Sequence, residues 1–185
     1  NCAAVLEAAK GSGLLVLPGM ELCTAEEAHV VCLFPALEGA LAFEAAVRPT
    51  LPPVENRPDI FGEQLLLDAQ DGIVGRETLL LTTASGISVD EVLGLARKHG
   101  GTAFPAHIDR PSYSVTAALG DLPPLGFAAV EITARGDVEA LCAQYREARG
   151  KILLCDSDAH YLENVGWKLP NIELPSCSAE CLVDA

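Results

Sequence analysis

The 185-residue sequence has few basic and few aromatic residues, and these shortages restrict its partners. Lysine and arginine number 12 against 26 aspartates and glutamates, the formal net charge is −14, and aromatic residues make up 5% of the chain. Nucleic-acid binding needs a basic face, and single strands also use aromatic side chains on which bases stack. The composition therefore argues against nucleic acid as a partner.

Long hydrophobic runs are also missing. The apolar stretches at residues 14–17 and 30–34 are far shorter than the roughly 20 residues that cross a bilayer, so we expect no membrane segment. The chain starts without Met and without a signal-peptide pattern. Because residues 3–10 have the pattern of a helix that ends at Gly11, we expect a segment upstream of Asn1. Seven scattered cysteines, an odd number, favour a reducing cytoplasm.

Half of the residues are hydrophobic, which is enough for one globular domain over residues 1–185. The alternation of apolar runs with helical patterns favours an α/β fold with mostly parallel strands, in a barrel or an open sheet. A proline-rich stretch at about 50–75 is expected to be a loop-rich excursion. The expected strands are 14–17, 29–33, 79–82, 102–106, 127–132 and 152–155, and the expected helices are 36–47, 88–99 and 138–148.

Acidic and histidine side chains follow several of these expected strands. Glu21, His107, and the pair Asp158 and His160 each come just after a different strand. The carboxyl ends of parallel strands gather active-site groups, so these residues are expected to converge on one cavity. His29 begins its strand and reaches the same cavity only if that strand runs the opposite way. Since Glu, His and Asp are ligands of zinc, manganese and iron, the sequence predicts a metal site.

Three of these residues have local interpretations as well. Asp158 has the pattern of an N-cap for residues 159–164, and His160 would then face solvent from the first turn. Glu21 has the pattern of a carboxylate before a helix at residues 24–27. His107 is different, because it ends an apolar strand, where an unpartnered imidazole is costly.

Four segments, in order, resemble motifs of the PHP (polymerase and histidinol phosphatase) family over residues 13–166. The first is a strand followed by Gly-x-Glu, and the second is a strand that begins with histidine. The third ends in histidine after a strand, and the fourth is a Ser-Asp-x-His signature. The matching residues are Leu-Leu-Val-Leu-Pro-Gly-Met-Glu at 14–21, Ala-His-Val-Val at 28–31, Gly-Gly-Thr-Ala-Phe-Pro-Ala-His at 100–107 and Cys-Asp-Ser-Asp-Ala-His at 155–160.

The resemblance implies an N-terminally truncated, distorted (β/α)7 barrel of PHP type with up to three divalent Zn, Mn or Fe ions. Glu21 would bridge two metals, His29 and His107 would bind one of them, Asp158 would bind the other, and His160 would bind the third. Known members hydrolyse phosphoesters. Within that activity Glu21 and His107 would be catalytic residues.

Arg110 is the third candidate catalytic residue, as a contact to the phosphate of a small phosphorylated substrate. Its alternative role is a surface salt bridge with Asp109 or another nearby acid.

The sequence departs from the family because the His-x-His and Thr-Asp-His motifs are not in it. Only the position of Glu21, His29 and His107 keeps all its ligands, so fewer than three metals are expected. Two hypotheses follow, namely a metal-dependent phosphoesterase impaired in this chain, and a non-catalytic metal-binding or protein-interaction module. In either case a homo-oligomer is expected to cover the strand edge left open by the truncation.

Overall fold

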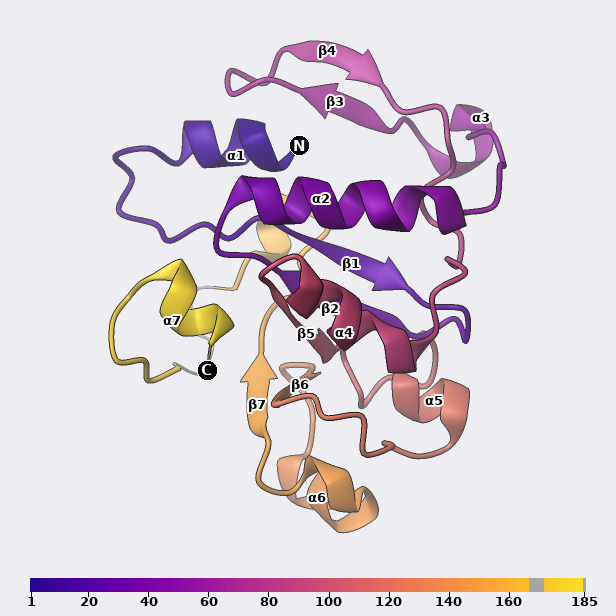
Figure 1. The fold of residues 1–185 in the computed structure, drawn as a ribbon, viewed down its shortest axis with the longest axis vertical. Coiled ribbons are helices and arrows are strands. Elements are labelled where there is room, and N and C mark those ends of the chain that lie inside the picture. The colour runs from indigo at the N-terminus through magenta and orange to yellow at the C-terminus, as the bar shows by residue number, and fades with distance from the viewer. Residues whose placement is uncertain (167–171, 185) are drawn as a thin grey trace.

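The computed structural model describes residues 1–166 and 172–184, which form a mixed α/β structure with three small separate sheets (Figure 1). The strands are β1 (Gly19–Cys23), β2 (His29–Leu33), β3 (Leu65–Leu67), β4 (Ile73–Arg76), β5 (Thr102–Pro105), β6 (Ala129–Ile132) and β7 (Ile152–Cys155). The helices are α1 (Cys2–Ala8), α2 (Leu37–Val47), α3 (Pro58–Phe61), α4 (Val89–Lys98), α5 (Val115–Leu119), α6 (Val138–Gln144) and α7 (Ala179–Val183). Short 3-10 turns lie at Arg48–Thr50, Arg146–Ala148 and Leu162–Asn164. The α/β class is confirmed, and the strands of the described residues form no closed barrel.

The expectation of mostly parallel strands is wrong. The three-stranded sheet has the order β1-β2-β5 and is antiparallel throughout, β3 and β4 form an antiparallel pair, and β6 and β7 are parallel. The reason is the connection between β1 and β2, which spans residues 24–28 alone. A parallel pair needs a crossover of a dozen or more residues, so a link this short makes a hairpin.

The hairpin brings the start of β2 to the edge where β1 and β5 end. Cys23 lies opposite His29, and Val30 lies opposite Pro105. Just past β5, the backbone N–H of Ile108 donates to the carbonyl oxygen of Glu131 in β6 at 2.9 Å. The parallel partner β7 then ends beside β6. Residues from five strands therefore meet at one edge.

Two of the expected strands are misplaced. Residues 14–17 are not a strand, and β1 begins at Gly19, so Glu21 lies inside a strand rather than after one. Leu79 forms only an isolated bridge with Glu55. In contrast, β2 and β7 have the expected bounds. The misplaced run carries exposed leucines at positions 14 and 15, so its hydrophobic character does not reflect burial in a sheet.

The excursion at about 50–75 contains more structure than a loop. It includes the short helix α3 and the β3–β4 hairpin, which lies near α1 in Figure 1. The side chain of Asn1 donates to the carbonyl oxygen of Leu65 and accepts from the backbone N–H of Leu67. These bonds tie the hairpin to the first residue of the chain.

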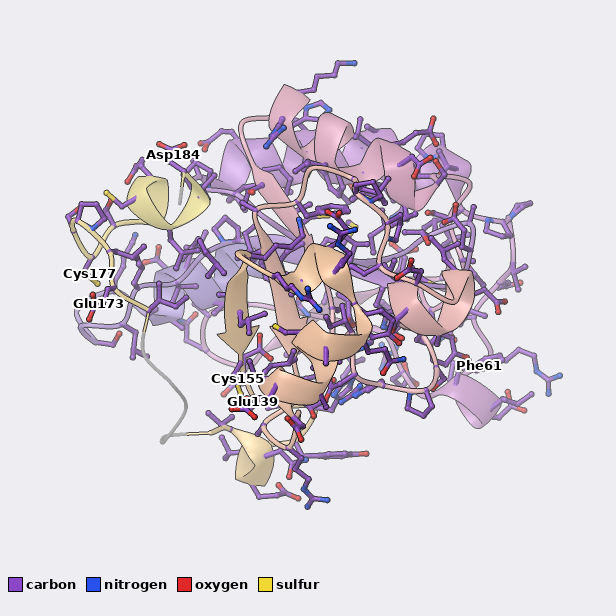
Figure 2. The ribbon with its side chains drawn as sticks, turned by 90° about the horizontal axis from the view of Figure 1, so that it is seen from below. Phe61, Glu139, Cys155, Glu173, Cys177 and Asp184 are labelled. Atoms are coloured by element: carbon purple, nitrogen blue, oxygen red, sulfur yellow. The ribbon has the colours of Figure 1, made fainter. Side chains whose placement is uncertain are left out.

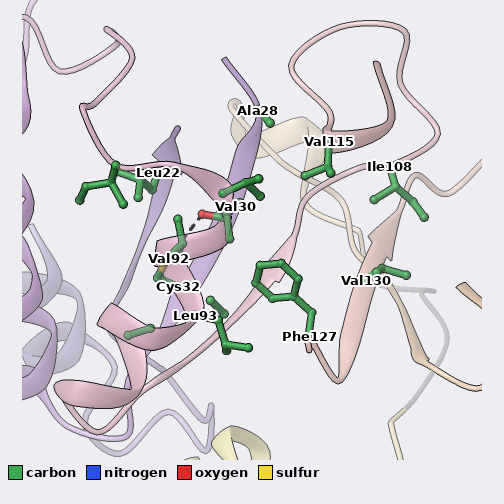
Figure 3. Close-up of a cluster of buried hydrophobic side chains, with 14 of the residues drawn as sticks. Leu22, Ala28, Val30, Cys32, Val92, Leu93, Ile108, Val115, Phe127 and Val130 are labelled. Carbon is green, nitrogen blue, oxygen red and sulfur yellow. Dashed lines mark hydrogen bonds between the residues drawn. The ribbon is translucent and has the colours of Figure 1, made fainter. Parts of the chain in front are cut away.

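Helix α4 covers the three-stranded sheet for reasons visible in its sequence. Ser88 caps its first turn, and the Glu91 carboxylate returns to the Ser88 backbone N–H, as the Ser-x-x-Glu pattern predicts. Its buried residues recur at helical spacing and pack into the core shared with β2, β6 and the segment after β5 (Figure 3). The core residues labelled there include Val30, Val92, Leu93, Ile108, Val115 and Val130.

The far ends of the molecule lie away from this core. Phe61 of α3 lies on the opposite side from Cys177 and Asp184, which flank α7 (Figure 2). No helix of the described residues has the length and apolar character needed to cross a membrane.

Candidate metal centre

Glu21, His29 and His107 form a group at the shared strand edge. In the β1–β2 register Glu21 faces Val31, which is two residues from His29, so the side chains of Glu21 and His29 are diagonal neighbours on one face. The backbone N–H of Ala106 donates to the carbonyl oxygen of His29, which brings His107 alongside. Strand pairing alone thus gathers residues that are 86 positions apart in the sequence, from 21 to 107.

The donor atoms of this group have the spacing of metal ligands. Glu21 Oε1 lies 3.2 Å from His29 Nδ1 and 3.4 Å from His107 Nε2, and all three donor atoms lie within 4.8 Å of one another. Ligands about 2.1 Å from a tetrahedral metal are about 3.4 Å apart, which is close to both separations. The three residues therefore fit one metal ion.

The electrostatics of Glu21 suit a cation. Hydrogen bonding from His107, and next from His29, holds the pKa of the Glu21 carboxyl well below its usual range, although partial burial acts in the opposite direction. The carboxylate is thus ionised at neutral pH. One carboxylate oxygen with two imidazole nitrogens is a donor set typical of zinc, manganese and iron.

His107 is the most constrained member of the group. Its side chain is 1% exposed, and its backbone φ is +32°, which is uncommon for a residue with a side chain. No residue in the described part of the chain bonds to its Nδ1. Its ring meets that of His29 edge to face, with centroids 5.4 Å apart. Such strain tends to concentrate at functional sites.

Tyr113 supports His29 from the other side. The two rings are stacked with centroids 5.0 Å apart, and the backbone N–H of His29 donates to the carbonyl oxygen of Tyr113 at 2.8 Å. Tyr113 also has a positive φ, of 54°, and is 56% exposed. Sequence reasoning missed this residue, because no local pattern shows which side chain will stack on a histidine.

Asp158, Arg110 and His160 form a second group, separate from the first. Arg110 Nη2 lies 2.8 Å from Asp158 Oδ2, and His160 Nδ1 lies 3.7 Å from Asp158 Oδ1. His160 is 68% exposed and bonds through Nδ1 to the backbone oxygen of Asp158. The structure thus brings these three predicted site residues together, but it does not place them among the donor atoms of the Glu21 group.

The local alternatives for Asp158 and Glu21 are wrong. The short 3-10 turn that follows Asp158 begins at Leu162 and has Tyr161 as its N-cap. Residues 24–27 form a turn rather than a helix, and Glu21 lies in β1. For Arg110, the salt bridge expected as its alternative role is present.

Glu131 is a buried carboxyl that sequence reasoning missed. It lies in β6 and is 3% exposed. Burial, and then the charges of Asp156, Asp158 and Glu21, raise the pKa of the Glu131 carboxyl. Its charged form is therefore disfavoured by burial and by nearby acids. The available signal was an acidic residue inside the apolar run Phe-Ala-Ala-Val-Glu-Ile at 127–132, because ionisable side chains are rarely buried without a partner.

In comparisons with known proteins, no family model matches the chain, and neither a curated protein nor a solved structure is significantly similar to it.

Proposed function

We propose that the protein is a metal-dependent phosphoester hydrolase of PHP type, in which Glu21, His29 and His107 hold a divalent zinc, manganese or iron ion. The observation that carries the proposal is the spacing of one carboxylate oxygen and two imidazole nitrogens, at 3.2 and 3.4 Å. The ordered motifs around these residues add the phosphoester chemistry. The substrate class is a small phosphorylated molecule.

A divalent ion at this group would supply Lewis acidity and lower the pKa of water. Glu21 would contribute the negative charge that offsets the cation. His29 and His107 would each bind the ion through a ring nitrogen. Arg110 supplies positive charge for the phosphate oxygens, since a guanidinium matches their geometry. Its contact with Asp158 holds the guanidinium at the same edge.

The finer fold is part of the same proposal. In the intact parent, upstream strands would complete a distorted (β/α)7 barrel and bring the missing histidines to the site. Asp158 and His160 would then hold further ions, up to three in all. Support comes from the order of the motifs that contain Glu21, His107 and Asp158.

We further propose that this chain forms a homo-oligomer through the edge of β1. Among the described residues β1 pairs only with β2, and a groove of about 440 Å³ runs between α1 and β1. Its lining includes the apolar side chains Val5, Val16, Leu17, Met20 and Val31. An open strand edge with apolar surface favours pairing with another chain. A monomer in light scattering at micromolar concentration would count against it.

The cytoplasm is the proposed location. All seven cysteines are free thiols, as is usual in a reducing compartment.

Metal analysis and turnover test the main proposal together. Protein purified without chelators is expected to carry about one equivalent of Zn, Mn or Fe and to hydrolyse p-nitrophenyl phosphate or another small phosphomonoester. Glu21→Gln and His107→Ala are expected to lose metal and activity, whereas Glu7→Gln, on exposed α1, keeps both. Unchanged metal-stimulated activity in Glu21→Gln or His107→Ala would remove the site assignment.

A non-catalytic metal-binding or interaction module is the second candidate. The observation in its favour is that Glu21, His29 and His107 are the one group of converging ligands among residues 1–166 and 172–184. Two-metal sites clamp both the attacking and the leaving oxygens, and one ion does this less well. Stoichiometric metal without turnover on any phosphoester would favour this candidate.

A further inference from the structure

A cleft of about 570 Å³ lies next to the Arg110–Asp158 pair, between the segment after β5 and helix α6. Its walls come from residues 108–111, the first turns of α5, the loop 135–137 after β6, and α6 with Tyr145. Figure 2 looks at the molecule from the side that carries α5 and α6. Ligand pockets usually measure about 300–1,000 Å³, so the cleft has the size for a small molecule.

Two arginines line this cleft, Arg110 and Arg135. This is notable in a chain with 26 acidic and 12 basic side chains. Arg110 has Asp158 as its ion-pair partner, whereas Arg135 has no carboxylate within salt-bridge distance among the described residues. The guanidinium of Arg135 thus has no ion-pair partner among the described residues, and that of Arg110 is held by Asp158.

The two carboxylates that also line the cleft are engaged within the protein. Asp109 accepts hydrogen bonds from the backbone N–H and the hydroxyl of Thr133. Asp137 is the N-cap of α6 and accepts from the backbone N–H of Ala140 at 3.0 Å. Neither acid pairs with Arg135, so its guanidinium is available to an incoming anion. Arg110 contacts Asp158 through Nη2 and keeps its other N–H donors for the same anion.

We propose that this cleft is an anion subsite in which Arg110 and Arg135 bind a phosphate group of the substrate. Two guanidinium groups match the two negative charges and the several acceptor oxygens of a phosphate. The cleft is much larger than a phosphate, so its remaining length takes the organic part of the ester, against Gln144 and Tyr145. The subsite rests on the proposed function and deepens it, because it adds a contact to the phosphate group of the substrate.

The test measures phosphate binding without metal, so that it is independent of the metal centre. Inorganic phosphate is titrated into chelator-treated protein and followed by calorimetry or by the 31P line width. Arg135→Ala is expected to weaken binding roughly tenfold or more, since hydrogen bonds to charged groups contribute about 1.5–3 kcal/mol. Arg135→Lys, which keeps the charge, is expected to recover part of the loss.

Two controls separate binding in the cleft from a general effect of removing an arginine. Arg97→Ala removes another exposed arginine, in the last turn of α4, and is expected to leave phosphate binding unchanged. Arg57→Ala, which removes an exposed arginine outside the cleft, is also expected to leave it unchanged in the metal-free protein. The subsite is overturned if the parent chain binds no phosphate, or if Arg135→Ala and Arg97→Ala bind it equally. Loss of binding in Arg135→Ala with no metal at Glu21 would uphold the subsite and remove the hydrolase proposal.

Discussion

The ring of Tyr113 stacks on the ring of His29, with centroids 5.0 Å apart and an angle of 28° between the planes. Because the His29 backbone N–H also bonds to the Tyr113 carbonyl, Tyr113 fixes both the main chain and the imidazole of a proposed ligand. Groups that orient a metal ligand typically contribute 10–100-fold to metal affinity.

Removal of that ring is therefore expected to weaken metal binding while leaving the ligands in place. Tyr113→Ala should lower zinc affinity about tenfold, whereas Tyr113→Phe, which keeps the stack, should bind as the parent does. Competition with a chromogenic chelator measures both. Equal affinities for the two variants would show that the stack does not position His29.

The two histidines at the site edge are expected to differ in their effect on metal binding. His29→Ala removes a donor atom of the Glu21 group and should lower affinity by more than about 100-fold, the upper range for residues that only support a ligand. His160 is 68% exposed and bonded to the Asp158 backbone. His160→Ala should therefore change the affinity for the first metal ion little. Cobalt binding, followed by visible absorption, distinguishes the two variants. A large loss of metal affinity in His160→Ala would contradict a metal site confined to Glu21, His29 and His107.

Glu131 should make the metal-free protein less stable as pH rises. Its pKa is raised in the folded state, first by burial and then by Asp156, Asp158 and Glu21, so the folded protein holds its proton more tightly than the unfolded chain. The stabilisation is complete below the unfolded pKa of about 4.3 and is lost as pH rises through the raised folded value.

Glu131→Gln is accordingly expected to be more stable than the parent chain at pH 8, by about 1–3 kcal/mol. At pH 5 this gain in stability over the parent chain is expected to be smaller. Urea unfolding in the presence of a chelator at both pH values measures the difference. Glu139→Gln, on the exposed side of α6, serves as the control. If the stability of Glu131→Gln and that of the parent chain depended on pH in the same way, the raised pKa of Glu131 would be contradicted.

Gly101 is required by the core rather than by the site. A Cβ there would overlap the ring of Phe34 and lie 2.6 Å from the carbonyl oxygen of Leu33, and Phe34 is fully buried. Gly101→Ala should therefore destabilise the fold by about 1–3 kcal/mol. Gly94→Ala in α4 has open space around the new methyl group and should stabilise the helix by up to about 1 kcal/mol. Thermal unfolding compares them, and a neutral Gly101→Ala would contradict this packing.

Much of the fold was predictable where the physical cause is local. The capping box at Ser88 and Glu91 begins α4 as its sequence pattern predicts, and β2 and β7 have the expected bounds. The strand before Glu21 was misplaced because the apolar run at 14–17 resembles a buried strand in composition, whereas it pairs with no strand among residues 1–166 and 172–184. Hydrophobic pattern reports apolar character, and pairing depends on what lies next to the segment.

The sequence by itself determined which side chains have the chemistry of metal ligands and where some elements lie, such as β2, β7 and the start of α4, since residue chemistry and helix capping are local properties. The tertiary structure decided which of those side chains lie together. It reversed β2 so that His29 meets Glu21 and His107, paired Asp158 with Arg110, and buried Glu131. Those outcomes depend on strand direction and on packing between residues far apart in the chain, and no local pattern encodes either of these.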